Sequence, residues 1–292
     1  MPTLVDKPPA KGDWSVEVKF DGWRCQIVID ENGARVFTRR GHDWTVGLKI
    51  IADAALNELI QMNGMKKVRS AIIDGELVYP HQSGRSDFHA LQAVVRSQSD
   101  KLLFMAFDLL HINGEDLRGH ALEERRDRLR GLIPAGGRIQ FSEALEGAPA
   151  ALYAAAERMA LEGIVCKRRG SPYRSGNAFD WLKVTCFVET ELELLGVQRE
   201  PGKSTIALMG APGTRNYVGS AFVTFGRPAS EAFWALVETN LGPPPPSFKA
   251  RPSDRVQWLM PGVIGRVRHL RNEEKLRHAT LVSVGQSGFY DI

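Results

Sequence analysis

The segment 102–110 constrains the fold of this 292-residue chain more than any other. Its residues are apolar except for Asp108, and Asn113-Gly114 then forms a predicted turn. An apolar run of this short length predicts a central β-strand that is buried on both faces. We therefore expect this strand to run through the core of a sheet-based domain.

The segment 16–21 alternates apolar and polar residues with a period of two, which predicts a half-buried β-strand. Glu17, Lys19 and Asp21 would then share one face of that strand. A lysine held on a rigid strand, between acids and beside Arg24, is a candidate covalent nucleophile. The alternative is the solvated face of an edge strand, which this segment taken alone favours.

Other segments up to residue 187 predict a mixture of strands and helices. Residues 1–14 are expected to be irregular, and the strand at 71–79 to be interrupted at Asp74-Gly75. Further strands are expected at 25–30, 34–38, 163–167 and 181–184, and helices at 46–62, 88–95, 123–132 and 148–161.

The pattern changes from about Glu189, where short strands recur around one helix at 230–240. About five strands with one helix suit a small Greek-key barrel such as an OB-fold. We place the domain boundary near residue 187. The strands are expected at 191–197, 205–210, 218–223, 255–259, 263–267 and 281–284.

The composition is that of a soluble globular protein, with 43% hydrophobic and 25% charged residues. No apolar run reaches the length of a membrane helix, and the N-terminus lacks the apolar core of a signal peptide. Cys25, Cys166 and Cys186 show neither a C-x-x-C nor a paired pattern, which indicates buried thiols in a reducing cytoplasm. The net charge of +4 permits a polyanionic partner without requiring one.

Six ordered segments resemble the motifs of the covalent nucleotidyltransferases, which comprise ATP-dependent DNA ligases, RNA ligases and mRNA capping enzymes. The match covers residues 15–187, and Phe-Asp-Leu-Leu and Trp-Leu-Lys-Val most resemble the ligase domain of bacterial end-joining DNA ligases. The segments are 19–24 (K-x-D-G-x-R), 38–41 (like S-R-x-G), 74–77 (D-G-E-L), 107–110, 162–167 and 181–184.

This resemblance implies an α+β fold in two domains. A nucleotidyltransferase domain, with ATP-grasp-like antiparallel sheets and helices, would span residues 1–187, and an OB-fold β-barrel would span residues 188–292. The catalytic cleft would lie between two antiparallel sheets of the first domain. The second domain would swing between a closed form for adenylation and a form clamped on DNA.

The resemblance also implies the chemistry of three lysines. Lys19 would attack the α-phosphorus of ATP as a free amine and form a lysyl–AMP phosphoramidate. Lys167 and Lys183 would stabilise the charge that develops on the α-phosphate. The alternative for these last two is that their ammonium groups reach the surface along apolar strands.

Five further residues would bind the nucleotide by the same resemblance. Glu17 would read the adenine amino group, and Phe107 would stack on the adenine. Glu76 would hold the ribose hydroxyls or a metal-bound water, and Arg24 and Arg39 would grip phosphate. The alternatives are core packing for Phe107, a turn-end carboxylate for Glu76 and a solvated turn for Arg39.

A divalent cation is expected at the same place. Glu162 is the best candidate ligand for Mg²⁺ or Mn²⁺, with Glu76 as the second, because phosphoryl transfer needs a carboxylate-bound metal near the phosphates.

The implied partner is nicked or broken duplex DNA, contacted mostly at its phosphates. A Ku-like end-binding protein is a candidate partner. The chain is expected to act as a monomer in the bacterial cytosol, with no membrane association.

Two departures from the ligase pattern keep other readings open. Thr185 stands where the last motif usually carries a second lysine, and 284–289 lacks the basic residues of the terminal R-x-D-K motif. Arg268, Arg271, Lys275 or Arg277 could substitute for that motif. The alternatives are an RNA ligase or capping-type nucleotidyltransferase, and a degenerate DNA-binding module without catalysis.

Overall fold

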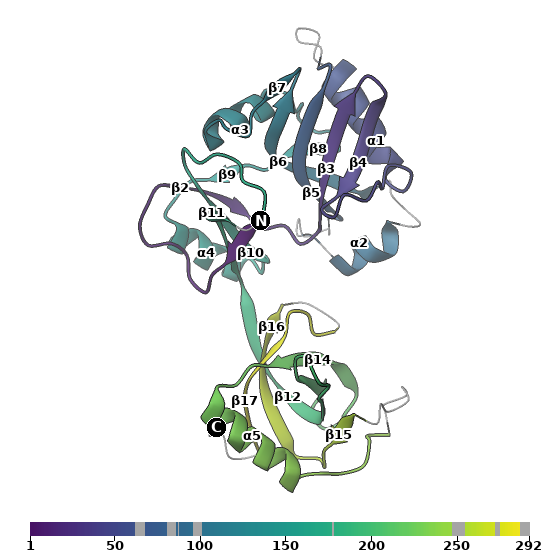
Figure 1. Cartoon of the computed structure of the whole chain (residues 1–292), viewed down its shortest axis with the longest axis vertical. Coiled ribbons are helices and arrows are strands. Elements are labelled where there is room, and N and C mark those ends of the chain that lie inside the picture. The colour runs from purple at the N-terminus through teal and green to yellow at the C-terminus, as the bar shows by residue number, and fades with distance from the viewer. Residues whose placement is uncertain are drawn as a thin grey trace. The chain divides into compact units, whose positions relative to one another are not determined.

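The computed structural model describes residues 1–61, 68–80, 86, 88–95, 101–176, 178–246, 255–271 and 275–286. The chain divides into two compact units, Met1–Cys186 and Phe187–Ile292 (Figure 1).

The first unit contains two sheets, here called the small sheet and the large sheet. The small sheet has the strand order β1-β11-β10-β2-β9, and the large sheet has the order β4-β3-β5-β6-β7, with β8 also paired to β6. The small-sheet strands are β1 (Pro2–Leu4), β2 (Trp14–Val18), β9 (Ala144–Leu145), β10 (Gly163–Arg168) and β11 (Ala178–Thr185). The large-sheet strands are β3 (Trp23–Asp30), β4 (Gly33–Thr38), β5 (Ala71–Val78), β6 (Leu103–Ile112), β7 (Glu115–Asp116) and β8 (Ile139–Phe141).

The helices of this unit lie close to the predicted ranges. The predicted helix at 46–62 is observed as α1 followed directly by a π-helix, η1. The elements are α1 (Lys49–Ala55), η1 (Leu56–Gln61), α2 (Phe88–Val94), α3 (Leu122–Arg130) and α4 (Pro149–Arg158).

The prediction of antiparallel sheets is wrong in two strand pairs, because both sheets are mixed. β1 runs parallel to β11, and β8 runs parallel to β6. β1 also lies in residues that were expected to be irregular. Both strands have three residues, so neither carries enough alternation to be recognised in the sequence.

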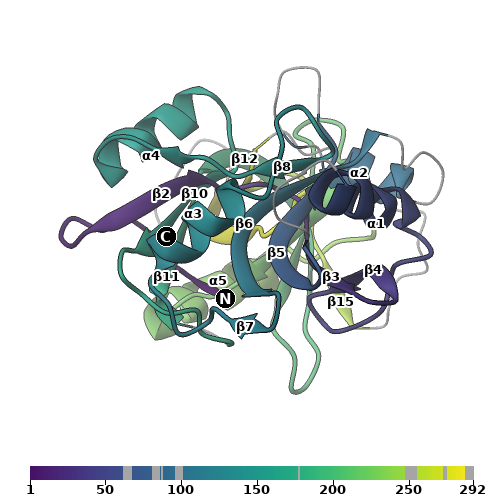
Figure 2. The ribbon, with the colours of Figure 1, turned by 90° about the horizontal axis from the view of Figure 1, so that it is seen from above.

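The two faces of the small sheet differ in chemistry. Val16, Ile164, Cys166 and Val184 pack with Ala156 of α4 in one buried apolar cluster, and Figure 2 shows α4 beside β2 and β10. The opposite face follows from the register, in which Glu17 pairs with Val165 and Val165 pairs with Lys183. Because side chains alternate along a strand, Ser15, Lys167, Trp181 and Thr185 share that second face.

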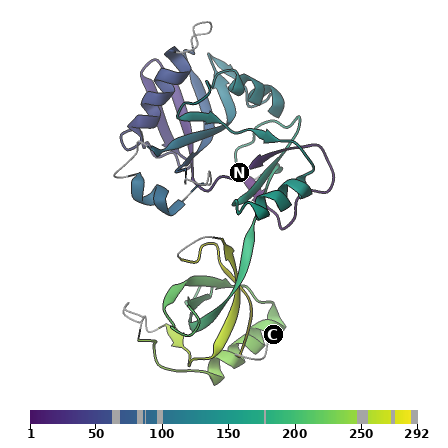
Figure 3. The same ribbon diagram turned by 180° about the vertical axis from the view of Figure 1, so that it is seen from behind.

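The predicted central strand is confirmed as β6, which pairs with β5, β7 and β8. Its predicted burial on both faces is only partly correct, because Leu103, Met105 and Phe107 are half-buried. Phe104, Ala106 and Leu109 are fully buried in a core that also contains Ile51 and Leu59. Ile51 lies on α1, which runs along the large sheet (Figure 3).

The predicted interruption at Asp74-Gly75 is wrong, because β5 is continuous. The irregularity lies on the partner strand, where Asp74 pairs with Asp108 and Gly75 pairs with Ala106. Phe107 is thus the extra residue of a β-bulge, a feature that redirects a side chain and frees backbone groups.

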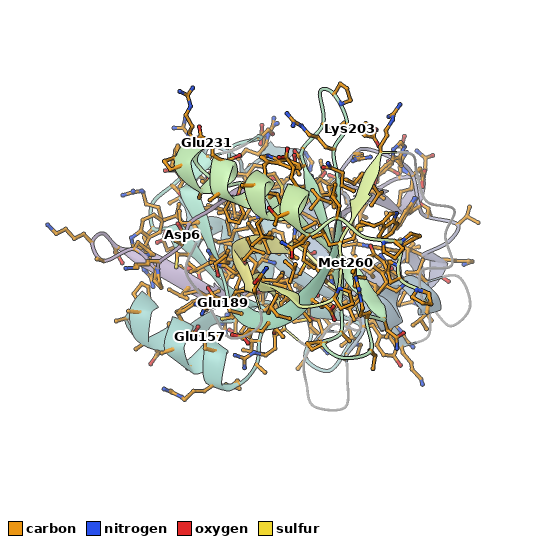
Figure 4. The ribbon with its side chains drawn as sticks, turned by 90° about the horizontal axis from the view of Figure 1, so that it is seen from below. Asp6, Glu157, Glu189, Lys203, Glu231 and Met260 are labelled. Atoms are coloured by element: carbon orange, nitrogen blue, oxygen red, sulfur yellow. The ribbon has the colours of Figure 1, made fainter. Side chains whose placement is uncertain are left out.

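In its described residues, the second unit contains a ring of five strands, a further short strand and one helix. β12 pairs with β13, β13 with β14, β14 with β17, β17 with β16, and β16 again with β12. Phe233 and Val237 of α5 pack into its buried core, whereas Glu231, labelled in Figure 4, is exposed. The elements are β12 (Phe187–Gln198), β13 (Ile206–Gly210), β14 (Tyr217–Val223), α5 (Arg227–Thr239), β15 (Val256–Trp258), β16 (Val263–Leu270) and β17 (Thr280–Gln286).

Of the helices in the described part of the chain, none combines the length and apolar character needed to cross a bilayer.

Candidate active site

Lys19 lies at the end of β2, one residue beyond the last strand residue, Val18. Its backbone N–H donates to the Gly163 carbonyl at 3.0 Å, which keeps it beside β10. Its ammonium group forms an ion pair with Glu162, the residue before β10. The prediction that Lys19 lies within the strand is therefore wrong by one residue, but its position is fixed from two sides.

The alternative of a solvated edge strand is wrong for this segment. β2 lies between β10 and β9, and both Val16 and Glu17 are buried, at 1% and 2% exposure. The polar face of β2 is directed into the unit, where its charges meet other charged side chains.

Lys19 and Glu162 belong to a group of charges that comes from both sheets. Burial lowers the pKa of Lys183, and the positive charges of Lys19 and Arg39 lower it further, while Glu162 opposes them. These effects require the four side chains to lie near one another. We call Lys19, Arg39, Glu162 and Lys183, together with Glu76, the lysine cluster.

Glu76 joins the lysine cluster from β5 of the large sheet. Burial raises the pKa of Glu76 to about 8, against the opposing charges of Lys19 and Arg24, and the negative charge of Glu162 also raises it. A carboxyl group in this position gives up its proton when a cation approaches.

Glu17 and Lys167 form a buried ion pair, with 2.6 Å between Lys167 Nζ and Glu17 Oε1. Glu17 Oε2 accepts a hydrogen bond from the Ser142 hydroxyl at 2.8 Å. Burial lowers the pKa of Lys167 to about 8, and Glu17 opposes this effect. Lys167 is 2% exposed, so the alternative that it reaches the surface is wrong.

The aromatic rings of Phe107 and Trp181 lie beside the Lys167 ammonium, with ring centroids 4.7 and 4.3 Å from Nζ. The two rings meet edge to face at 5.9 Å. Phe107 is only partly buried and belongs to β6, whereas Trp181 belongs to β11. These contacts place Phe107 at the site, so it is not solely a core residue.

Arg24 is held by the large sheet through a paired contact with Asp74. Arg24 Nε and Nη2 donate to the two Asp74 carboxylate oxygens at 3.1 and 2.6 Å. The Tyr173 hydroxyl donates to Asp74 at 2.7 Å and accepts from Arg24 at 3.2 Å. The Arg24 guanidinium also lies 5.3 Å from the Phe107 ring, which links it to the rest of the site.

Arg39 follows β4 and is exposed, as the alternative of a solvated turn would have it. Its backbone N–H nevertheless donates to the Arg24 carbonyl at 3.1 Å, and its charge acts on Lys183. All nine predicted site residues thus gather in the first unit.

Among the described residues that contact this set, sequence reasoning missed Arg126, Ser142, Tyr173 and Met1, whose sulfur lies 2.9 Å from Arg24 Nη1. Arg126 Nη1 lies 2.8 Å from Glu17 Oε1. Arg126 lies in α3, whose many charged residues resemble a solvated helix, so the sequence carries no signal that two of them, Arg125 and Arg126, are buried. Ser142 and Tyr173 lie in connecting segments without a recognisable motif.

Of the two departures from the ligase pattern, the structure describes Thr185 fully but the terminal segment only in part. Thr185 lies at the end of β11 opposite Gly163, on the same face as Lys183, and is 7% exposed. Of the segment 284–289, the residues 287–289 lie outside the described residues. Arg268, Arg271, Lys275 and Arg277 belong to the second unit.

The residues present fit a magnesium ion that is bound partly by substrate. Within the described residues, no group of three or more His, Cys, Asp or Glu side chains is arranged around a common point. Mg²⁺ at phosphoryl-transfer sites usually takes one or two carboxylates and completes its shell with phosphate oxygens and water. Glu162 and Glu76 supply such a pair.

The part of the chain that matches known proteins includes the same motifs. Residues 5–185 match the family model of the ATP dependent DNA ligase domain. The chain is 39% identical over 203 residues to the multifunctional non-homologous end joining protein LigD of Pseudomonas aeruginosa, covering 68% of this chain and 23% of that protein. It is 32% identical over 189 residues to a probable DNA ligase of Dictyoglomus turgidum, covering 59% of this chain and 31% of that protein.

The chain therefore spans less than a third of the length of these two relatives. Two solved structures share its fold. The mycobacterial DNA ligase D complexed with ATP and MES gives a TM-score of 0.55 at 22% identity, covering 98% of this chain and 95% of that one. A Lig E DNA ligase, described as binding DNA with a minimal scaffold, gives a TM-score of 0.62 at 17% identity, covering 98% of this chain and 99% of that one.

The predicted nucleotidyltransferase fold and the resemblance to bacterial end-joining ligases are thus confirmed. Because the matching family model extends over more than half of its residues and through all six motifs, this chain belongs to the ATP-dependent DNA ligase domain family.

Proposed function

We propose that this chain seals breaks in duplex DNA with ATP, through AMP carried on Lys19. The observation that supports this most directly is the placement of Lys19 in the lysine cluster. There its ammonium group pairs with the Glu162 carboxylate, and its charge acts on a second lysine, Lys183. A nucleophilic amine and a cation for the phosphate are the groups that adenylyl transfer needs.

In the first step the Lys19 amine attacks the α-phosphorus of ATP. A phosphorus–nitrogen bond forms, the bond to the bridging oxygen breaks, and pyrophosphate leaves. Glu162 accepts the hydrogen bond from the Lys19 ammonium and is the nearest group to receive its proton. Lys183 and Lys167 offset the negative charge that grows on the α-phosphate oxygens.

In the second step the 5′-phosphate of the broken strand attacks the lysyl–AMP, which frees Lys19 and leaves AMP on the DNA end. In the third step the 3′-hydroxyl attacks the adenylated phosphate, the backbone bond forms, and AMP leaves. Arg39, an exposed member of the lysine cluster, would contact one of these phosphates.

Nucleotide binding would use the groups around Lys167. Phe107 would stack on the adenine, and Glu17, which pairs with Arg126 and Lys167, would accept a hydrogen bond from its amino group. Arg24 keeps its guanidinium on Asp74, so its phosphate contact would come from the edge that faces Phe107.

Glu162 and Glu76 would hold Mg²⁺ or Mn²⁺ near the phosphates. When bound, the ion would neutralise phosphate charge and polarise the phosphorus–oxygen bonds.

We assign residues 1–187 to the adenylation domain and residues 188–292 to an OB-fold domain. The second assignment is supported by the closed ring of β12, β13, β14, β16 and β17, with α5 between β14 and β16. In this scheme the second domain would add basic contacts to the DNA backbone.

The relatives of this chain suggest its partners. The Pseudomonas aeruginosa relative is named for non-homologous end joining, which favours broken duplex ends, a Ku-like end-binding partner and a location in the bacterial cytosol. One chain carries every residue of the proposed site, in keeping with action as a monomer.

The proposal is tested with a duplex that carries one nick and a labelled 5′-phosphate. With ATP and Mg²⁺, the label should move into the full-length strand, and GTP should not replace ATP. A protein–GMP adduct formed with GTP, and none with ATP, would favour a capping-type enzyme, and sealing confined to RNA ends would favour an RNA ligase. Nick binding without transfer would favour a non-catalytic module.

A further inference from the structure

Arg126 contacts two groups of the proposed site at once. Its side chain is 7% exposed on α3. Arg126 Nη1 lies 2.8 Å from Glu17 Oε1 and donates to the Phe107 carbonyl at 3.1 Å. Lys167 Nζ contacts the same two oxygens, at 2.6 and 3.1 Å. Two cations therefore share two acceptors in a closed arrangement of four atoms.

The β-bulge explains why the Phe107 carbonyl is available to both cations. Phe107 is skipped in the pairing of β6 with β5 and lies beyond the residues that pair β6 with β8. Its carbonyl thus faces side chains where a regular strand residue would meet a neighbouring backbone. Without a donor this buried carbonyl would be costly, and Arg126 and Lys167 supply two.

The second arm of Arg126 reaches the other side of the Glu17 carboxylate. Arg126 Nη2 donates to the Ser142 carbonyl at 2.6 Å, and the Ser142 hydroxyl donates to Glu17 Oε2 at 2.8 Å. The guanidinium also lies over the Phe141 ring at 4.7 Å. A planar fork held at these points fixes the orientation of Glu17 in a way that a flexible lysine does not.

The charge of Arg126 also acts on Lys167. Lys167 faces Glu17 from β2, Asp108 from β6 and Arg126 from α3. Its ammonium has three N–H donors. Because Glu17 and the Phe107 carbonyl take two of them, the third remains for a phosphate oxygen. Arg126 shares Glu17 with Lys167, so the carboxylate does not neutralise Lys167 alone.

We propose that Arg126 is a positioning residue for adenylyl transfer, which holds Glu17 and the Phe107 carbonyl and so presents Lys167 to the α-phosphate of ATP. This inference rests on the proposed function, because it takes Lys167 as a phosphate-binding cation. Arg126 itself touches neither the nucleotide nor Lys19 in this scheme.

Three variants separate this role from a structural one. Arg126→Gln removes charge and fork, and Arg126→Lys keeps the charge but loses the fork. Arg130→Gln is the matched control, because Arg130 lies one turn later on α3 and over the same Phe141 ring, at 4.8 Å. Its ion pair with Glu143 is exposed, at 59% and 58%. For each variant, kcat and kcat/KM for AMP uptake from ATP are measured from pH 6 to 10, alongside thermal melting.

Arg126→Gln should lower kcat by about 10- to 100-fold, since a misplaced cation no longer meets the developing charge. Loss of the positive neighbour should also raise the pKa of Lys167, which lies at about 8 in the native protein. The fall of kcat/KM at alkaline pH should therefore move up by about one pH unit. Arg126→Lys should lower kcat without changing the alkaline pH at which kcat/KM decreases. Arg130→Gln should have the kcat and the pH dependence of the native protein.

If kcat/KM of Arg126→Gln decreases at the same alkaline pH as in the native protein, the proposal is overturned, because a structural defect lowers activity without changing the charge around Lys167. If Arg126→Gln does not fold, Arg126→Lys decides, and a native kcat in that variant would overturn the proposal. A native protein that takes up no AMP would overturn the proposed function and this inference with it.

Discussion

Lys19 and Glu162 form an ion pair that joins the end of β2 to the residue before β10. The two side chains are 18% and 13% exposed, so the contact is shielded from water but open at one side. Because β2 and β10 are neighbours in the small sheet, this pair holds Lys19, the proposed nucleophile, against the strand that also carries Lys167.

Replacing Glu162 with Gln should slow AMP uptake by about 100-fold, since Lys19 loses the carboxylate that receives its proton and small displacements of reacting groups are costly. The measurement is the rate of adduct formation with ATP and Mg²⁺, with Glu146→Gln, an exposed residue of the same unit, as control. If Glu162→Gln takes up AMP at the native rate, Glu162 has no role in this step.

Glu76 makes the stability of the protein depend on pH. Its pKa is about 8 in the folded chain, against an ordinary value of 4.5 for a glutamate side chain in water. Between these values the folded state holds a proton that the unfolded state has released, so the free energy of unfolding falls as pH rises. Glu76→Gln removes this pH-dependent contribution, so the variant should be more stable than the native protein by about 4 kcal/mol at pH 8 and by about 1 kcal/mol or less at pH 5.

Urea unfolding at the two pH values checks this prediction. The comparison uses the difference between variant and native protein, so the titration of other groups cancels. An equal difference at pH 5 and pH 8 would show that Glu76 is not held in its protonated form.

Gly75 should not tolerate a side chain. A Cβ atom at this position would lie 2.4 Å from the Phe104 ring and 2.7 Å from the Met105 carbonyl. Gly75→Ala should therefore destabilise the protein by about 2 kcal/mol or more, as overpacked cores do. Gly47→Ala is the control, since its new methyl group would meet only the Trp44 carbonyl, at 3.7 Å. Equal melting temperatures of the two variants would contradict the packing of β5 against β6.

Arg125 and Asp108 form an ion pair in which both side chains are fully buried. Arg125 also donates to the His120 and Ser171 carbonyls at 2.7 and 2.9 Å. Arg125→Ala should lower the free energy of unfolding by about 3–5 kcal/mol, because it leaves a buried charge without its partner.

The control for Arg125 lies on the same helix. Arg128 pairs with Glu115 and Glu124 at the surface, so Arg128→Ala should cost about 1 kcal/mol or less. Both variants are compared by chemical denaturation, and similar losses in the two would show that the buried pair adds nothing beyond a surface pair.

The local patterns of the sequence were sufficient to place most strands. Period-two alternation predicts Glu17 on the polar face of β2, and the observed register adds Lys167 and Lys183 to the same face of the small sheet. These positions could be predicted because each depends on a strand's own alternation and on motifs that occur in fixed order.

The remaining parts depend on contacts between distant segments. The bulge at Phe107 arises from the pairing of β6 with β5, so β6 alone does not show it. Arg126 reads as one more charged residue of a surface helix until α3 packs on β6. For the same reason the parallel strands β1 and β8, with three residues each, were not predicted.

The central claim is that Lys19 carries AMP, and intact mass measurement tests it most directly. After incubation with ATP and Mg²⁺, the native protein should gain the mass of one AMP, and Lys19→Ala should gain none while keeping its thermal stability. Addition of a nicked duplex should then return the native protein to its original mass. An adduct of equal yield in Lys19→Ala, or no adduct in the native protein, would contradict the account.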